Sequence, residues 1–436
     1  MTTSASITIA PGRRLRGELT VPGDKSITHR AIMLAALADG TSRLSGYCRG
    51  EDCLNTARAF RAMGIAIDER GDALEVAGKG LWGLSEPDHP LDCGNSGTGI
   101  RLMTGLLAGQ DFFTVLTGDE SIRRRPMGRV VRPLRAMGAT IAGRKGGELA
   151  PLAISGRRLQ GVIYQSPVAS AQIKSAVLLA GLFADGVTRI REPRGSRDHT
   201  ERMFSFFNCP LEVRDREVSV KGRPSVSWRG REDLAIPGDL SAAAFFLVAA
   251  SILPDSDVLI RNVGVNPTRT GVLEILGRMG ASIEVCHERE QAGEPVADLR
   301  VTPRRLRGVS IGAADIPRTI DEFPILCVAA ALAEGETVIS GAEELRVKES
   351  DRISTMAAEL RNMGAAIQER PDGLVIQGAG GARLHGARGQ SHGDHRVAMS
   401  LAIAALVGDA PTRIEDTDCI ETSFPGFEQK LSNLLT

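Results

Sequence analysis

The segment SAQIKSAVLLAGLFADG, residues 170–186, contains the pattern that decides the fold. It begins with serine, a residue that often caps the first turn of a helix. A run of small and aliphatic residues follows, and the Asp-Gly pair at its end is typical of a helix C-terminus. A helix that is apolar on all sides belongs in a protein interior. The sequence therefore predicts a buried helix over this segment.

The same pattern recurs along the whole chain. Six such helices are expected to begin near Ser26, Ser96, Ser170, Ser241, Asp321 and Asp394. Each is followed by a short strand, a charged loop and a second helix, and Met-Gly closes four of the second helices before a pair of strands. Pro126, Pro267 and Pro425 are expected in the first turns of second helices. Self-similarity at a regular period is typical of a fold built from like units.

A repeated opening divides the six units into two groups of three. Val21-Pro22-Gly23-Asp24 and Ile236-Pro237-Gly238-Asp239 precede the first and fourth buried helices. The sixth unit lacks final strands, and residues 6–21 provide a matching pair. We therefore expect one domain over 22–238 and a second that combines 1–21 with 239–436. The alternative, one continuous solenoid, is disfavoured because this pairing of the termini closes each half.

Composition narrows the classes of function. A chain of 436 residues exceeds the usual size of a single core. Its 53 basic residues equal its 53 acidic ones, so no overall positive field attracts nucleic acid or a membrane. Seven scattered cysteines without zinc-like pairs are typical of reduced thiols. Met1–Ala10 lacks the pattern of a signal peptide and Ser241–Leu253 is too short to span a bilayer, so we expect a cytoplasmic protein.

The starts of the predicted buried helices carry polar and charged residues. A helix N-terminus offers unpaired N–H groups and a partial positive charge, which favour anions. The runs at these starts are Asp24-Lys25-Ser26, Asn95-Ser96-Gly97-Thr98-Gly99, Ser170-Ala171-Gln172, Asp321-Glu322 and Asp394-His395-Arg396. The loops before the second helices add Arg123-Arg124-Arg125, Arg197-Asp198-His199 and residues 346–352. Each run alone is typical of a helix cap or a solvated face. Their recurrence at equivalent places predicts a cationic pocket for two small polyanions.

Taken in order, seven motifs resemble those of the 5-enolpyruvylshikimate-3-phosphate (EPSP) synthase family. They are PGDKSITHR, GNSGTGIR, RRRPMGR, SAQIKSA, IDEFP, RVKESDR and GDHRVAM, and they span nearly the whole chain. The resemblance implies an α/β fold of two similar domains, each of three βαβαββ repeats, with the active site in the cleft between them. It also implies transfer of the enolpyruvyl group of phosphoenolpyruvate to the 5-hydroxyl of 3-phosphoshikimate in the shikimate pathway, without metal or cofactor. We expect a monomer that binds neither nucleic acid nor membrane.

Carried over motif by motif, the resemblance implies three sets of site residues. The catalytic residues would be Asp321 as the base for the hydroxyl, Glu349 at the methylene carbon, and Lys25 beside the bridging oxygen. The contacts to 3-phosphoshikimate would be Lys25, Ser26, Arg30, Ser170, Ala171, Gln172, Arg197, Asp321 and Lys348. The contacts to phosphoenolpyruvate would be Lys25, Gly97, Arg125, Gln172, Arg352 and Arg396.

Several positions bear on this assignment. Many relatives have a lysine where this chain has Thr422, which removes an expected cation. Glyphosate-resistant relatives carry alanine at Gly97, so we predict sensitivity to glyphosate. UDP-N-acetylglucosamine enolpyruvyl transferases are the nearest alternative, but they use Lys-Asn where this chain has Lys25-Ser26 and commonly cysteine where it has Glu120. A non-catalytic anion-binding scaffold is a further alternative, which Asp321 and Glu349 oppose because carboxylates weaken anion binding.

Overall fold

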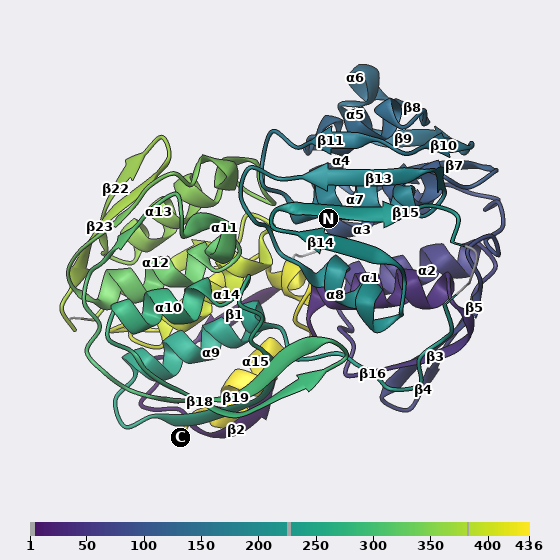
Figure 1. Ribbon diagram of the computed structural model, residues 1–436. Coiled ribbons are helices and arrows are strands. Elements are labelled where there is room, and N and C mark those ends of the chain that lie inside the picture. The colour runs from purple at the N-terminus through teal and green to yellow at the C-terminus, as the bar shows by residue number, and fades with distance from the viewer. Residues whose placement is uncertain (1–4, 225–227, 382) are drawn as a thin grey trace. The chain divides into compact units, whose positions relative to one another are not determined.

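The computed structural model describes residues 5–224, 228–381 and 383–436 and divides into two compact units (Figure 1). Unit 1 comprises residues 1–22, 238–289 and 295–436, and unit 2 comprises residues 23–237 and 290–294. The first four residues of the expected segment 1–21 lie outside the described part. The chain changes unit beside each of the two repeated Pro-Gly-Asp sequences. Residues 290–294 belong to unit 2, whereas the sequence prediction includes them in 239–436.

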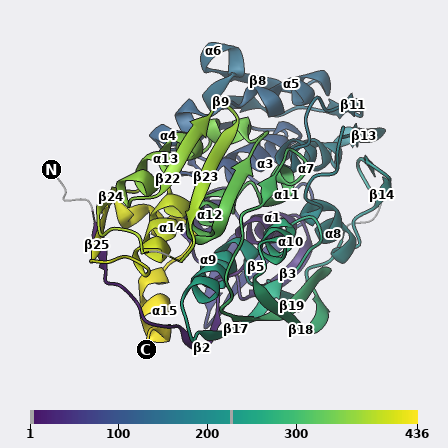
Figure 2. The ribbon, with the colours of Figure 1, turned by 90° about the vertical axis from the view of Figure 1, so that its left-hand side faces the viewer.

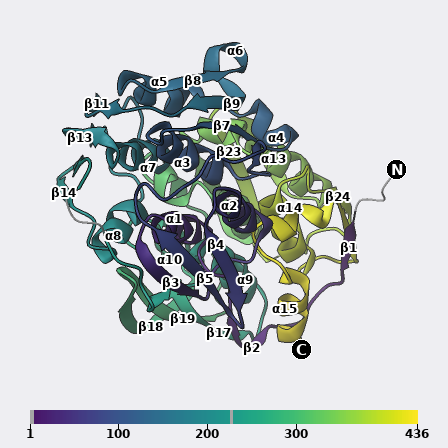
Figure 3. The same ribbon diagram turned by 90° about the vertical axis from the view of Figure 1, so that its right-hand side faces the viewer.

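Unit 2 has three buried helices, with sheets and further helices around them (Figure 3). The buried helices are α1 (Lys25–Ala36), α3 (Gly97–Ala108) and α7 (Ala171–Gly181). The other helices are α2 (Glu51–Ala62), α4 (Glu120–Arg124), α5 (Gly128–Ala136), α6 (Arg144–Gly147) and α8 (His199–Phe206). The strands are β3 (Asp39–Ser45), β4 (Ala66–Arg70), β5 (Ala73–Lys79), β6 (Leu91–Asp92), β7 (Phe113–Thr117), β8 (Thr140–Gly143), β9 (Leu149–Ser155), β10 (Leu159–Gln160), β11 (Ile163–Gln165), β12 (Ala184–Asp185), β13 (Val187–Arg191), β14 (Leu211–Arg214), β15 (Glu217–Lys221) and β16 (Leu234–Ala235).

The three large sheets of unit 2 share one topology. Their orders are β16-β3-β5-β4, β6-β7-β9-β8 and β11-β13-β15-β14. In each sheet the first strand is parallel to the second, and the remaining pairs are antiparallel. The leading strands β6 and β11 directly precede their buried helices, but β16 comes from the far end of the unit. The last strand of unit 2 therefore completes its first sheet.

Unit 1 is built in the same way around three other buried helices (Figure 2). These are α9 (Leu240–Ile252), α12 (Phe323–Leu332) and α14 (His395–Ala405). The other helices are α10 (Gly271–Arg278), α11 (Ile316–Thr319), η1 (Glu343–Val347), α13 (Arg352–Asn362), η2 (Thr417–Thr422) and α15 (Phe427–Leu434). The strands are β1 (Ser6–Ile9), β2 (Arg16–Thr20), β17 (Asp257–Gly264), β18 (Ser282–Gln291), β19 (Glu294–Thr302), β20 (Ser310–Ile311), β21 (Glu334–Ile339), β22 (Ala366–Arg370), β23 (Gly373–Ala379), β24 (Arg388–Gln390) and β25 (Thr412–Glu415).

The N-terminal strands join two different sheets of unit 1. The sheets have the orders β2-β17-β19-β18, β20-β21-β23-β22 and β1-β25-β24. Strand β1 runs antiparallel to β25 and closes the last sheet, as the sequence predicted. Strand β2 instead runs parallel to β17, where it is the leading strand of the fourth repeat. The expected strand pair within residues 6–21 is therefore divided, because the fourth repeat also needs a leading strand.

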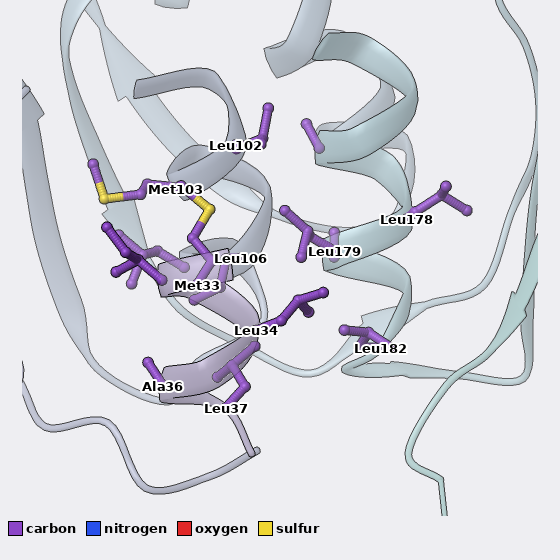
Figure 4. Packing of buried hydrophobic residues seen from close by; sticks show 14 of the residues in the cluster. Met33, Leu34, Ala36, Leu37, Leu102, Met103, Leu106, Leu178, Leu179 and Leu182 are labelled. Carbon is purple, nitrogen blue, oxygen red and sulfur yellow. The ribbon is translucent and has the colours of Figure 1, made fainter. Parts of the chain in front are cut away.

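The buried helices form the core of each unit. In unit 2 the aliphatic and methionine side chains of α1, α3 and α7 meet, among them Met33, Leu106 and Leu179 (Figure 4). Helices α3 and α7 approach closely at Gly105, where a Cβ atom would lie 2.1 Å from the carbonyl oxygen of Ala176. In unit 1 the buried face of α9 runs from Leu240 to Ser251 without interruption. These helices are buried on all sides, as their sequences predict.

The predicted starts of the buried helices are correct, but their predicted ends and the proline positions are wrong. Helix α7 ends at Gly181, and Asp185 of the expected Asp-Gly stop lies in strand β12. The six buried helices begin within two residues of the predicted starts. The second helices α5, α10 and α15 begin two to four residues after Pro126, Pro267 and Pro425. At Pro126 the following residue donates its N–H to the carbonyl of Glu148, which holds this segment on a neighbouring loop instead of in a helical turn. Among the described residues, no helix combines the length and apolarity needed to cross a membrane.

Candidate active site

In unit 2, Lys25 and Ser26 form the first turn of α1. The carboxylate of Asp24 caps this helix by accepting a 2.9 Å hydrogen bond from the N–H of Ile27. The ammonium nitrogen of Lys25 lies 3.0 Å from Oδ2 of Asp52 in α2, and the two side chains are 16% and 6% exposed. Lys25 is therefore held at the helix start by a largely buried acid. Asp52 lies in none of the sequence motifs, so no local signal indicated it.

Arg30 lies one turn further along α1 and connects three helices. Its Nη1 donates to the carbonyl of Ser26 at 2.8 Å, its Nε to Thr200 in α8 at 2.7 Å, and its Nη2 to Ser175 in α7 at 2.8 Å. Burial lowers the pKa of Arg30 to about 10, although Glu201 and Asp24 oppose this effect. Nearby Arg197 also lowers the pKa of Arg30, as a neighbouring positive charge should. These two arginines thus share one electrostatic environment.

Two buried guanidinium groups converge on Gly97, the first residue of α3. A Cβ atom on Gly97 would lie 2.9 Å from Nη1 of Arg101 and 3.0 Å from Nη1 of Arg125. Arg101 donates to Oε1 of Gln172 at 2.7 Å, and Arg125 donates to Oδ1 of Asn95 at 2.8 Å. A helix N-terminus and two cations at one glycine form a suitable site for a carboxylate or phosphate. Arg101 is the last residue of the motif GNSGTGIR, but the family resemblance assigned it no contact.

Ser170, Ala171 and Gln172 form the start of α7. The hydroxyl of Ser170 caps the helix by accepting the N–H of Ile173 at 3.4 Å. Gln172 donates to the hydroxyl of Thr98 at 3.1 Å, which connects α7 to the start of α3. The starts of two buried helices of unit 2 are therefore linked directly by their own polar side chains.

In unit 1 the predicted residues gather around the side chain of Arg352, which is 1% exposed. Its Nε lies 2.8 Å from Oδ2 of Asp394, and its Nη2 lies 2.8 Å from Oε2 of Glu349. Its Nη1 lies 3.6 Å from Oδ1 of Asp321. Burial opposes the charge of Arg352, but the three carboxylates outweigh it and raise the pKa of Arg352 well above its usual range. Both predicted catalytic carboxylates thus contact one permanently charged guanidinium.

Arg396 and Lys348 complete this half of the site. Nη1 of Arg396 donates to the backbone carbonyl of Asp321 at 2.9 Å, and its Nε lies 3.9 Å from the Asp321 carboxylate. Burial lowers the pKa of Lys348, while Asp321, Glu344 and Glu349 oppose that shift. Lys348 therefore lies in the field of both predicted catalytic acids. Asp394 was noted only as a helix start, although the motif that contains it was recognised.

The loop that lacks the expected lysine has a hydroxyl group instead. Thr422, at the end of η2, donates to the carbonyl of Cys419 at 2.7 Å and lies 3.4 Å from Nδ1 of His395.

In the described part of the chain, no group of three or more His, Cys, Asp or Glu side chains is arranged to hold a metal ion.

Each unit thus carries a distinct part of the predicted site. Unit 2 contributes Lys25, Ser26, Arg30, Gly97, Arg125, Ser170, Ala171, Gln172 and Arg197. Unit 1 contributes Asp321, Lys348, Glu349, Arg352 and Arg396. The set in unit 2 is mainly cationic and includes helix N-termini, whereas the set in unit 1 combines cations with two carboxylates. Such sets can bind anions and, through the carboxylates, transfer protons.

Known proteins are similar to this chain in both sequence and fold. The family model described as EPSP synthase (3-phosphoshikimate 1-carboxyvinyltransferase) matches residues 9–431. The chain is 57% identical over 429 residues to 3-phosphoshikimate 1-carboxyvinyltransferase of Geobacter sulfurreducens, covering 98% of this chain and 99% of that protein. The solved EPSP synthase from Acinetobacter baumannii matches with a TM-score of 0.88 and 44% identity, covering 99% of this chain and 98% of that one.

A more distant structure has the same fold. The enolpyruvyl transferase NikO from Streptomyces tendae matches with a TM-score of 0.79 at 18% identity, covering 99% of this chain and 98% of that one. These similarities confirm the predicted α/β fold class and the predicted family. The chain belongs to the EPSP synthase family.

Proposed function

We propose that the chain transfers the 1-carboxyvinyl group of phosphoenolpyruvate to the 5-hydroxyl of 3-phosphoshikimate and releases phosphate. Its membership of the EPSP synthase family supports this reaction. The observation that carries the assignment of residues is the pair of carboxylates on Arg352: Asp321 and Glu349 lie beside one buried cation in unit 1. We also propose that the sets of residues in both units act on the same pair of substrates.

The reaction requires a base for the acceptor hydroxyl. Attack of the 5-oxygen on C2 of phosphoenolpyruvate forms the new C–O bond, and the hydroxyl must lose its proton. Asp321 fits this role because its carboxylate is 20% exposed, and so open to a ligand, and is flanked by Arg352 and Arg396. Those two contacts fix the orientation of the carboxylate.

A second group must donate a proton to the methylene carbon and later remove one. This carbon gains a proton as the tetrahedral intermediate forms, and the methyl group loses one when the C–O bond to phosphate breaks. Glu349 is the second carboxylate on Arg352 and is 16% exposed, so it suits a group that donates and then accepts this proton. The phosphate leaves with the electrons of that bond.

The cations bind the substrates and stabilise charge in this scheme. Lys25 neutralises the bridging oxygen as phosphate departs, and Arg125 and Arg352 bind phosphoenolpyruvate. Arg30 and Arg197, which share one electrostatic environment, bind the phosphate of 3-phosphoshikimate together with Ser26 and Ser170. Fixed cations contribute orientation and electrostatic stabilisation without covalent chemistry.

The test is analysis of the products formed by the purified chain from phosphoenolpyruvate and 3-phosphoshikimate. We expect one equivalent of phosphate and one of the 5-enolpyruvyl ether of 3-phosphoshikimate. A parallel reaction with UDP-N-acetylglucosamine as acceptor addresses the nearest alternative and should release no phosphate. Phosphate release from phosphoenolpyruvate with UDP-N-acetylglucosamine but not with 3-phosphoshikimate would contradict the proposal. Release without any acceptor would also contradict it.

We propose further that the chain acts as a monomer in the cytoplasm and binds neither nucleic acid nor membrane. Equal numbers of basic and acidic residues support the last point because no general positive field is present. Sedimentation equilibrium across a range of protein concentrations tests the oligomeric state, and a mass that rises with concentration would contradict it.

A further inference from the structure

A buried triad of charges lies behind the start of α7 in unit 2. The ammonium nitrogen of Lys174 is 2.7 Å from Oε1 of Glu201 and 3.1 Å from Oε2 of Glu192. The three side chains are only 4%, 8% and 4% exposed, respectively. Removing three charges from water costs several kcal/mol per ion, roughly, before their attraction offsets it. Hydrophobic residues would fill this volume at no such cost, so a role beyond packing is indicated.

The charge of Lys174 is maintained by its partners. Burial opposes the ammonium charge, but Glu201 and Glu192 outweigh burial and raise the pKa of Lys174. Burial raises the pKa of Glu201, and the ammonium of Lys174 opposes that shift. The lysine therefore stays protonated near neutral pH and provides a fixed anchor for a carboxylate.

Glu192 uses its two oxygens to hold two separate segments of the chain. Its Oε1 accepts a 2.8 Å hydrogen bond from the backbone N–H of Ser170, the capping residue of α7. Its Oε2 accepts a 2.8 Å hydrogen bond from the hydroxyl of Ser196, the residue before Arg197. Ser170 and Arg197 are both proposed contacts to 3-phosphoshikimate. One carboxylate thus connects both segments and is itself held by Lys174.

Glu201 differs from Glu192 in the segments that it contacts. It pairs with the same ammonium from α8, but it makes no hydrogen bond to Ser170 or Ser196 among those of the described residues. It follows Thr200, whose hydroxyl accepts from Arg30. The two acids therefore match in burial and charge, but only Glu192 is hydrogen-bonded to the Ser170 cap and to the loop of Arg197. Glu201 instead acts on Arg30 through its charge.

We propose that Glu192 is a positioning residue for the phosphate of 3-phosphoshikimate: anchored by Lys174, it sets the position of the Ser170 cap relative to the loop that carries Arg197. This inference rests on the proposed function. Since Glu192 acts through unit 2 segments on one substrate only, its loss weakens binding of 3-phosphoshikimate and leaves the contacts to phosphoenolpyruvate in place. A purely structural role would lower stability without favouring one substrate.

The test compares Glu192→Gln with Glu201→Gln, which each remove one buried charge from the same lysine. For Glu192→Gln we expect the KM for 3-phosphoshikimate to rise at least about tenfold, because small misplacements of binding groups are costly. The kcat and the KM for phosphoenolpyruvate should stay within about threefold of wild type on the same reasoning. Glu201→Gln should lower the unfolding temperature to a similar degree. Because Glu201 acts on Arg30 only through its charge, the KM for 3-phosphoshikimate should rise less than in Glu192→Gln.

An unchanged KM for 3-phosphoshikimate in folded Glu192→Gln would overturn the inference, as would equal losses for both substrates. If Glu192→Gln does not fold, Ser196→Ala removes only the bond to the loop and carries the test. Calorimetry should then show weaker binding of 3-phosphoshikimate than in wild type, and equal affinity would overturn the inference. These outcomes are separate from failure of the proposed function, which would appear as absence of phosphate release by the wild-type chain.

Discussion

Arg352 donates a 2.8 Å hydrogen bond from Nε to the carboxylate of Asp394, and Asp394 also caps helix α14. The other carboxylate oxygen of Asp394 accepts the backbone N–H of Arg396 at 2.9 Å. A single fully buried acid thus fixes both arginines that we assign to phosphoenolpyruvate in unit 1. Asp394 holds both because one arginine is its ion-pair partner and the other lies in the first turn of the helix that it caps.

Replacing Asp394 by Ala should therefore destabilise the protein strongly. Removing one partner of a buried ion pair leaves an uncompensated charge and typically costs about 3–5 kcal/mol. Urea denaturation gives the free energy of unfolding. The matched control is Asp257→Ala, which breaks an Asp–Arg pair whose side chains are 44% and 52% exposed and should cost at most about 1 kcal/mol. Equal losses in the two variants would show that burial of the Asp394 pair has no energetic consequence.

Asp321→Asn should lower kcat by at least about a hundredfold, because the amide cannot accept the hydroxyl proton. The substitution keeps the size of the side chain and the backbone carbonyl that binds Arg396. Phosphate release under saturating substrates measures the effect. Asp315→Asn is the control: it changes the same group at the residue before helix α11, where Asp315 pairs with Arg278, and should leave kcat unchanged. Near-normal turnover in Asp321→Asn would remove this residue from the role of base.

Lys25→Met should also lower kcat by at least about a hundredfold, since methionine preserves length but cannot neutralise the departing phosphate. The change also leaves Asp52 without its ion-pair partner, so a thermal unfolding scan is needed beside the rate. Lys145→Met, at an exposed position, is the matched control. A folded Lys25→Met protein with normal turnover would contradict the role assigned to this ammonium group.

Gly97→Ala should weaken the binding of phosphoenolpyruvate and of glyphosate. The added methyl group would meet the tips of Arg101 and Arg125 at 2.9 Å and 3.0 Å, so both cations must move. We expect wild type to be inhibited by millimolar glyphosate and the variant to need at least about tenfold more, equivalent to about 1.4 kcal/mol. Gly277→Ala, in helix α10 with open space around its Cβ, should behave as wild type. Uninhibited wild-type activity would refute the predicted sensitivity.

His29 should make the stability of the protein fall in mild acid. Burial and the charges of Lys25 and Arg30 lower the pKa of His29 from 6.5 to about 3. The unfolded chain therefore binds a proton at His29 that the folded state does not bind. The free energy of unfolding consequently decreases as pH falls below 6.5. The loss is about 1 kcal/mol from pH 6.5 to 5.5 and approaches 1.4 kcal/mol per further unit.

Urea titrations of wild type and His29→Gln at pH 6.5 and 5.5 test this sign. The variant lacks the titrating group, so its free energy of unfolding should fall less between the two pH values by about 1 kcal/mol. The contributions of the other titrating groups are the same in both proteins and cancel in the comparison. Identical pH dependence of the two proteins would show that His29 has the same pKa in the folded and unfolded states, and would contradict the prediction.

The features that the sequence predicted are those with local signals. A capping residue is followed directly by an apolar run, as in 170–186, so the starts of the buried helices could be placed within two residues. The Asp-Gly pair misplaced the end of α7, because Asp185 lies in the strand that follows the helix. Partners that come from distant segments left no such signal. Asp52 and Glu192 are ordinary acids in sequence, and their importance depends on Lys25 and Lys174, which fold against them.

The strands show the same limit. Strand β2 follows β1 closely in sequence, but its partner β17 lies more than 230 residues further along the chain, in a sheet that needs a leading strand. The family resemblance identified contact residues because it compares whole motifs. It could not indicate the acids that hold those residues in position.

The placement of β16 has a consequence for synthesis on the ribosome. Unit 2 obtains the last strand of its first sheet at residues 234–235, so its three sheets can form before most of unit 1 has been translated. Strand β1, in contrast, cannot pair with β25 until residues 412–415 have been translated. Its exposed edge therefore remains available to other chains during nearly the whole of translation, and this is the period in which the nascent protein is most prone to aggregate.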